Sequence, residues 1–361
     1  MSPRLDDLPI RDDLRGMSPY GAPQARVPVA LNVNENTHPV PKEVADDILD
    51  GVALALRDVN RYPDREFTQL REAFAEYLGH GLTRDQLWAA NGSNEVLQQV
   101  LQAFGGPGRT VFGFAPTYSM YPLLARGTGS AWVAGVRGVD YTLDAEAAAG
   151  QVAEAHPDVV LLCSPNNPTG TPLPIDVIER VYDATDGIVV VDEAYWEFAP
   201  RDERSALTLL PGRERLVVSR TMSKAFAFAG ARVGYLAADP AVIDALRLVR
   251  LPYHLSALTQ AAALAALRHA PTMLATVDDI VAQRDRISAT LEALGYKPYE
   301  SWTNFVLFGG VDEPTATWQA LLDRGVLVRD VGLPRSLRVS AGTEEETSAF
   351  LDALASIDSA S

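Results

Sequence analysis

Short runs of consecutive apolar residues alternate with amphipathic stretches between about Leu87 and Leu236. The runs lack alternating polar residues, which is the pattern of strands whose two faces are both covered by helices. It predicts an α/β domain with a mostly parallel sheet, and such sheets bind ligands at the carboxyl ends of their strands. The predicted strands are Val111–Phe114, Val159–Leu162, Ile188–Val191, Leu216–Val218 and Val233–Leu236.

After Pro252 the pattern changes to two long helices followed by short strands. The predicted helices are Leu258–His269 and Thr276–Leu294, and the strands are Phe305–Phe308, Val326–Val328 and Leu337–Val339. Six prolines among the first 40 residues predict an extended arm. We therefore expect an arm that packs with the small domain (residues 1–40), a large domain (41–255) and a smaller α+β domain (256–361).

Composition narrows the class of protein. The 361 residues are 47% hydrophobic and 22% charged, with a net charge of −16, which argues against a nucleic-acid partner. No stretch reads as a signal peptide or a membrane span, so we expect a cytoplasmic protein without a membrane partner. The lone cysteine, Cys163, ends an apolar run and is expected to be a buried structural thiol. Its neighbours and the five histidines form no metal-binding motif, and no metal is expected.

Two segments carry the clearest candidate chemistry. In the first, Asp192 ends an apolar run and Tyr195 follows three residues later. In the second, Lys224 lies close to hydroxyl side chains, with Arg232 eight residues further on. Pyridoxal phosphate needs these groups: an amine for its aldehyde, an acid for its ring nitrogen, and hydroxyls and a cation for its phosphate. A lone lysine is usually a surface residue and a strand-end carboxylate is often a helix cap, but the combination favours a pyridoxal-phosphate site.

Two further motifs have both a structural and a functional interpretation. Asn91-Gly-Ser-Asn-Glu95 precedes apolar residues with helical spacing, so its backbone N–H groups could bind an anion or simply begin a capped helix. Ser164-Pro-Asn-Asn-Pro-Thr-Gly170 follows the run ending at Cys163. This stiff turn could present an asparagine amide to a phenolate oxygen, or could serve only as a turn.

Together these motifs resemble the class I and II aminotransferases, pyridoxal-phosphate enzymes of fold type I. Ser-Pro-Asn-Asn-Pro-Thr-Gly, Asp-Glu-Ala-Tyr and Ser-Lys-Ala-Phe occur intact and in the order of that family. The resemblance extends over nearly the whole chain to the histidinol-phosphate aminotransferases. The supporting segments are Leu31–Asn36, Asn60–Asp64, Ala90–Asn94, Arg250–Leu255, Val328–Asp330 and Leu337–Arg338.

The resemblance implies catalytic roles for Lys224, Asp192 and Tyr195. Lys224 would bind the cofactor covalently and act as acid and base, and Asp192 would pair with the ring nitrogen. Tyr195 and Asn167 would hydrogen-bond O3′, and Tyr118 would stack on the ring. The residues implied for the cofactor phosphate are Gly92, Ser93, Asn94, Thr221, Ser223, Arg232 and, from the second subunit of a homodimer, Tyr62.

Substrate binding is implied for Tyr20, Asn36, Tyr253, Arg329 and Arg338. Two guanidinium groups suit a dianion. In this family they hold the substrate phosphate in one half-reaction and the carboxylates of glutamate or 2-oxoglutarate in the other. The candidates for the imidazole pocket, which the sequence does not rank, are Glu35, Tyr118, Tyr253 and Asn304.

We therefore expect a homodimeric transaminase of histidine biosynthesis. It would exchange the amine of histidinol phosphate with 2-oxoglutarate, giving imidazole-acetol phosphate and glutamate. Three alternatives stay open: an aromatic amino-acid aminotransferase, an amino-acid phosphate decarboxylase and a non-catalytic regulatory module. The chain departs from the family pattern at Thr37, where proline is usual, and at Tyr20-Gly-Ala-Pro23. Both departures lie near the substrate side of the site. They therefore leave the identity of the substrate open, whereas the cofactor assignment is unaffected.

Overall fold

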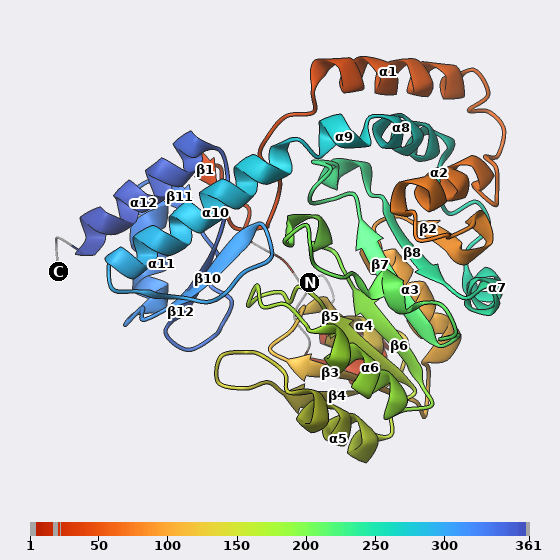
Figure 1. Cartoon of the computed structure of the whole chain (residues 1–361), viewed down its shortest axis with the longest axis horizontal. Helices are drawn as coiled ribbons and strands as arrows, with labels where there is room; N and C mark the ends of the chain where they lie inside the picture. Colours follow the sequence, from red (N-terminus) through yellow and green to blue (C-terminus); the bar gives the residue numbers. More distant parts are fainter. Residues whose placement is uncertain (1–4, 17–20, 22, 359–361) are drawn as a thin grey trace.

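A seven-stranded sheet forms the centre of the large domain in the computed structural model, which describes residues 5–16, 21 and 23–358 (Figure 1). The strand order is β2-β8-β7-β6-β5-β3-β4. All neighbouring pairs are parallel except those of β8, which is antiparallel to β2 and β7. The strands are β2 (Leu87–Ala90), β3 (Thr110–Ala115), β4 (Ala131–Val136), β5 (Val159–Cys163), β6 (Ile188–Asp192), β7 (Leu216–Thr221) and β8 (Gly234–Ala238).

All five strands predicted for this domain are present. Two more, β2 and β4, were not predicted. β4 lies at the edge of the sheet and is mostly exposed, so it lacks a continuous apolar run. β2 has only four residues, two of them alanine. The reversed direction of β8 has no signature in its own sequence, because β8 is buried along its whole length like the parallel strands of the sheet.

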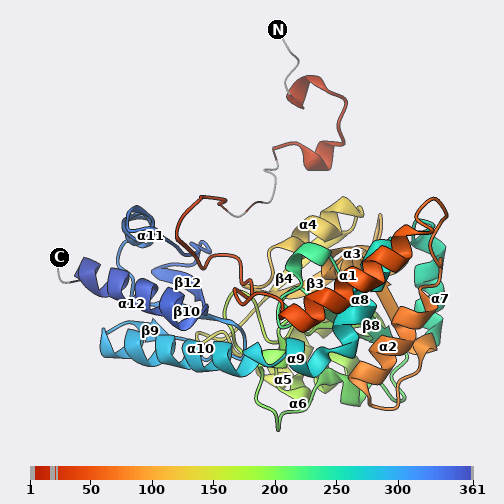
Figure 2. The ribbon, with the colours of Figure 1, turned by 90° about the horizontal axis from the view of Figure 1, so that it is seen from above.

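Helices cover both faces of this sheet, with α3 and α4 on one side and α5 and α6 on the other (Figure 2). This arrangement explains why β5, β6 and β7 are buried along their whole length. The helices packed around the sheet are α1 (Lys42–Leu56), α2 (Thr68–Leu78), α3 (Ser93–Phe104), α4 (Met120–Gly127), α5 (Ala145–Ala155), α6 (Ile175–Asp183), α7 (Pro240–Val249), α8 (Ala257–Arg268) and α9 (Ala270–Met273).

A smaller α+β unit is built around a second hydrophobic core. Its three-stranded antiparallel sheet has the order β12-β10-β9. The three strands expected here are all present. The elements are α10 (Thr276–Ala293), β9 (Lys297–Pro298), β10 (Phe305–Gly309), α11 (Pro314–Asp323), β11 (Val326–Leu327), β12 (Ser336–Ser340) and α12 (Glu344–Asp358).

The packing of α8 indicates that it belongs to the large domain. The sequence-based boundary after residue 255 assigns α8 to the small domain. In the structure α8 lies along α1, and Ala263, Ala266 and Met273 of α8 and α9 are buried in the core of the large domain. We propose a boundary between α9 and α10, because the two hydrophobic cores separate there.

The end of the N-terminal arm joins the small domain. Strand β1 (Val29–Ala30) pairs in parallel with β11, and the N–H of Leu31 donates to Leu327 O at 2.8 Å. The earlier residues 5–16 project outward from the large domain beside α4 (Figure 2). There Arg11 donates to the carbonyl oxygens of Arg126 and Gly127 at 3.0 and 3.2 Å. None of the helices in the described part of the chain has the length and apolarity needed to cross a membrane.

Candidate active site

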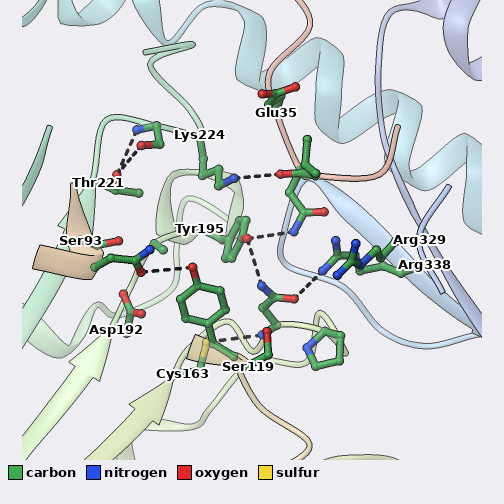
Figure 3. Close-up of a pocket in the computed structure, with 18 of the residues that line it drawn as sticks. Glu35, Ser93, Ser119, Cys163, Asp192, Tyr195, Thr221, Lys224, Arg329 and Arg338 are labelled. Carbon is green, nitrogen blue, oxygen red and sulfur yellow. Dashed lines mark hydrogen bonds between the residues drawn. The ribbon is translucent and has the colours of Figure 1, made fainter. Parts of the chain in front are cut away.

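A cavity of about 510 Å³ lies beyond the carboxyl ends of β5, β6 and β7, where residues of the arm and of the small domain complete its wall (Figure 3). This is where sheets of this topology bind ligands. Most of the residues singled out from the sequence line it. They are Ser93, Asn94, Tyr118, Asn167, Asp192, Tyr195, Thr221, Ser223, Lys224, Arg232, Arg329 and Arg338.

Asp192 is a buried carboxylate at the end of β6. Its oxygens accept hydrogen bonds from Tyr121 Oη at 2.9 Å and Ser219 Oγ at 3.0 Å. Burial raises the pKa of Asp192 to about 6, although both hydroxyls act against this shift. A buried carboxylate gains most from a cationic partner, so this position suits a protonated ring nitrogen. Sequence reasoning missed Tyr121, since nothing local relates α4 to a strand end 71 residues later.

Lys224 lies in the turn after β7, and its Nζ donates to Val33 O at 3.1 Å. Burial lowers the pKa of Lys224 to about 8, and the nearby Arg338 and Arg232 guanidinium groups act in the same direction. With that pKa roughly a tenth of the amine is neutral at pH 7, compared with far less for an ordinary lysine. The amine is therefore available as a nucleophile and as a base.

A hydrogen-bonded chain connects Tyr195 to Arg338 (Figure 3). The amide nitrogens of Asn34 and Asn167 lie 2.9 and 3.5 Å from Tyr195 Oη. Asn167 Oδ1 in turn accepts from Arg338 at 2.6 Å. Local sequence does not single out Asn34, because its contact with Tyr195 spans 161 positions of the chain.

The beginning of α3 forms a cradle for an anion. Gly92 has a φ of +87°, and a Cβ there would lie 2.3 Å from Arg232 Nη2. A Cβ at Gly234 would lie 2.1 Å from Ser93 N, so glycine at both positions permits the close approach of α3, β8 and Arg232. Within the described residues no side chain caps α3. Its first N–H groups, the hydroxyls of Thr221 and Ser223, and the Arg232 guanidinium are the donors that a phosphate needs.

Arg329 and Arg338 lie opposite each other on paired backbone, with each N–H donating to the other's carbonyl at 2.9 Å. Both side chains reach the cavity (Figure 3). Arg338 is buried and donates to Asn32 O at 3.0 Å as well as to Asn167. The Arg329 side chain has no hydrogen bond or ion pair to any residue that the structure describes. Two adjacent guanidinium groups give this end of the cavity the charge that a dianion requires.

Of the residues predicted to bind cofactor or substrate, Gly92, Asn36, Tyr62 and Tyr253 are described by the structure but do not line the cavity of this chain. Tyr20 lies outside the described residues. Asn36 turns away and donates to Ala225 O at 3.3 Å and Thr276 Oγ1 at 3.1 Å, so it ties the turn after Lys224 to α10. Tyr62 and Tyr253 stack on each other with ring centroids 4.4 Å apart, outside the cavity wall.

The structure also ranks the candidates for the imidazole pocket. Glu35 and Tyr118 line the cavity, whereas Tyr253 and Asn304 do not. Asn304 is buried behind the wall, where its amide donates to Asn34 O at 3.0 Å. Glu35 is therefore the candidate whose carboxylate could accept a hydrogen bond from an imidazole N–H.

This chain belongs to the class I and II aminotransferases, whose family pattern matches residues 26–354. It is 66% identical over 354 residues to the histidinol-phosphate aminotransferase of Paenarthrobacter aurescens, covering 97% of this chain and 95% of that protein. It is 55% identical over 350 residues to that of Thermobifida fusca, covering 97% and 95%.

Solved structures agree with this assignment. The histidinol-phosphate aminotransferase of Sinorhizobium meliloti, in complex with pyridoxal-5′-phosphate, superposes with a TM-score of 0.84 at 26% identity, covering 98% of each chain. A mutant aspartate aminotransferase of Thermus thermophilus gives 0.80 at 25% identity, covering 96% of this chain and 99% of that one. The α/β fold of type I, the aminotransferase class and the pyridoxal-phosphate cofactor predicted from the sequence are confirmed.

The cavity fits this cofactor at both of its ends. The cradle of Gly92, Ser93 and Arg232 offers donors for the phosphate, while the buried Asp192 offers a negative charge for the ring nitrogen. Lys224 lies on the same cavity wall with a partly neutral amine. The residues that would hold the group are therefore all present on one chain, apart from the contact expected of Tyr62.

Proposed function

We propose that this chain transfers the amino group of L-histidinol phosphate to 2-oxoglutarate in histidine biosynthesis, giving imidazole-acetol phosphate and glutamate. The observation that carries the proposal is the 66% identity, over nearly the full length, to a histidinol-phosphate aminotransferase. The pair Arg329 and Arg338 supports it, because a phosphate dianion and a second carboxylate are the groups that distinguish these substrates from simple amino acids.

In this proposal each cavity residue has a separate task. Pyridoxal phosphate, when bound, supplies a conjugated ring that delocalises the electrons of the substrate's Cα–H bond. Lys224 holds the cofactor and moves the Cα proton, since its amine is partly neutral and lies on the cavity wall. Asp192 keeps a proton on the ring nitrogen by charge pairing. Tyr195 and Asn167 hold O3′, and Arg329 with Arg338 orients the distal anion of the substrate.

A single half-reaction tests the substrate. Purified, cofactor-loaded protein is mixed with histidinol phosphate, histidinol or phenylalanine, without any keto acid, and the cofactor absorbance is followed. We expect histidinol phosphate to react at about 10- to 100-fold lower concentration than histidinol, because charge-assisted hydrogen bonds to the phosphate contribute about 1.5–3 kcal/mol. Arg329→Gln is the matched variant, and it should reduce this preference while leaving the reaction of histidinol nearly unchanged.

Other outcomes of the same experiment identify the alternatives. An equal or better reaction with phenylalanine would make the protein an aromatic amino-acid aminotransferase. Release of carbon dioxide from an amino-acid substrate would indicate a decarboxylase, and absence of any reaction with all amines would favour a regulatory module.

We also propose that the working form is a homodimer in which Tyr62 completes the partner's cofactor site. Tyr62 is 80% exposed and lies outside the cavity of its own chain. The neighbouring surface of α1 and the turn after it is apolar, with Leu49, Leu54, Leu56 and Val59 each more than half exposed. An exposed apolar patch of this kind suits a protein contact. The cytoplasmic location expected from the sequence stays a prediction.

Mixing two defective variants tests this shared site. Tyr62→Phe should bind the cofactor phosphate more weakly, and Lys224→Ala should be inactive. In a mixed dimer, the intact Lys224 of one chain meets the intact Tyr62 of the other. We therefore expect activity at limiting cofactor to exceed that of either variant alone after the two are unfolded and refolded together. If mixing restores nothing although sedimentation shows dimers, Tyr62 does not act across the interface.

A further inference from the structure

Asn34 is a buried residue at the cavity whose side-chain orientation is fixed from three directions. It is 2% exposed. Ser340 Oγ accepts from the Asn34 backbone N–H at 3.0 Å and donates to Asn34 Oδ1 at 3.2 Å. Asn304 holds the Asn34 carbonyl at 3.0 Å. The Ser340 hydroxyl donates to the amide oxygen, and the amide nitrogen points the other way, toward Tyr195.

The backbone around Asn34 reinforces this orientation. Its φ is +56°, in the left-handed region that asparagine tolerates better than most residues. The two preceding residues also contact the site: Asn32 O accepts from Arg338 at 3.0 Å, and Val33 O accepts from Lys224 Nζ at 3.1 Å. Three successive residues of the arm therefore contact three side chains of the site, those of Arg338, Lys224 and Tyr195.

The phenol oxygen of Tyr195 accepts two hydrogen bonds and donates none to the described residues. A phenol has one hydrogen to donate and accepts at its oxygen. Asn34 Nδ2 donates to it at 2.9 Å, and Asn167 Nδ2 lies at 3.5 Å. Within the described part of the chain, Tyr195 Oη has no acceptor for its own hydrogen. With its acceptor side occupied, the phenol can stabilise a neighbouring oxygen only as a donor, and the free direction is the cavity.

We infer that Asn34 is a positioning residue for Tyr195: by donating to the phenol oxygen, it directs the phenol hydrogen toward O3′ of the bound cofactor and makes it a stronger donor. The inference rests on the proposed contact of Tyr195 with O3′. Hydrogen bonds in a row polarise one another, so a donor on the phenol oxygen strengthens the bond that the phenol donates. The Asn34 hydrogen bond also lowers the pKa of Tyr195, against the rise that burial causes.

The test is the pH midpoint of the visible absorbance change of the lysine-bound cofactor. A hydrogen bond to O3′ stabilises the deprotonated state, in which this oxygen carries more negative charge, so loss of the bond raises the midpoint. Asn34→Gly removes the amide and still permits the positive φ. We expect it to raise the midpoint by about 0.5 pH unit, and Tyr195→Phe to raise it by about 1 unit or more.

The double variant decides whether Asn34 acts through Tyr195. If it does, Asn34→Gly adds nothing to the midpoint once Tyr195 is phenylalanine. An equal shift in both backgrounds, or no shift from Asn34→Gly alone, overturns the inference while leaving the role of Tyr195 intact. If Tyr195→Phe itself shifts nothing, the proposed contact with O3′ is wrong and the inference falls with it.

A second variant keeps the inference testable if Asn34→Gly does not fold. Ser340→Ala removes the hydroxyl that holds Asn34 Oδ1 but keeps the whole Asn34 side chain. We expect a smaller rise of the midpoint, again absent when Tyr195 is phenylalanine. A midpoint equal to that of the unchanged protein would contradict the inference, because the amide would then need no support.

Discussion

Lys224→Ala should abolish covalent cofactor binding and lower turnover by about 10³-fold or more, since the amine is both the attachment point and the acid–base group. Its half-buried side chain and its pKa of about 8 make it the partly neutral amine on the cavity wall. The measurement is reduction with borohydride, unfolding and mass determination, which reveals whether the cofactor stays attached. A variant that keeps both the visible absorbance band and turnover would show that another group carries the cofactor.

The composition of the chain makes this experiment unusually clean. Only three lysines occur in 361 residues: Lys42, Lys224 and Lys297. Lys42 is exposed on α1 and pairs with Asp46, and Lys297 is exposed on β9 of the small domain. Lys42→Arg and Lys297→Arg are therefore matched controls that should retain the attached cofactor. Any label on a peptide without Lys224 would point to adventitious modification of the surface.

Local sequence was sufficient to predict those parts of the site that a single short segment of the chain forms. Asp192 could be placed at a sheet edge because the apolar run before it defines a buried strand. The cradle could be anticipated from Gly92 because the turn before α3 needs a positive φ, here +87°, which glycine adopts without strain. In each case the physical constraint lies within a few residues of the functional group, so the local pattern carries it.

Contacts between distant segments could not be predicted in the same way. Asn34 and Asn36 are both amides of one short motif, yet Asn34 contacts Tyr195 whereas Asn36 contacts Ala225 and α10. Which amide faces the cavity depends on how the arm lies against β12, where Ser340 holds Asn34. Likewise, α8 has the pattern of any amphipathic helix. Only its packing on α1 assigns it to the core of the large domain.

Asp192→Asn should lower turnover by about 100- to 5000-fold, because removing one partner of a buried charge pair costs about 3–5 kcal/mol. The exchange should not disturb the fold. The side-chain partners of the carboxylate, Tyr121 and Ser219, are hydroxyls that can accept from an amide as well as donate, and the amide oxygen can still accept from a donor. Cofactor titration should show weaker binding to the variant, whereas an unchanged affinity and turnover would show that Asp192 does not pair with the ring nitrogen.

Asp192→Asn is expected to weaken cofactor binding, but it should stabilise the folded protein when no cofactor is bound. The pKa of Asp192 is raised from 3.8 to about 6, so the folded state holds this proton more tightly than the unfolded state. The protonated Asp192 carboxyl therefore contributes to stability. This contribution is fully present below the unfolded pKa of 3.8 and is lost as the pH rises through the folded pKa of about 6. A shift of this size corresponds to about 3 kcal/mol.

Urea unfolding of the cofactor-free protein and of Asp192→Asn between pH 4 and 8 therefore separates the two effects. Relative to the variant, the unchanged protein should lose stability as the pH rises, and adding cofactor at pH 8 should reverse that order. A stability difference that does not vary with pH would mean that Asp192 is stabilised as a carboxylate by the protein alone. The carboxylate would then need no cationic partner, and the charge pairing that holds the cofactor ring would lose its physical basis.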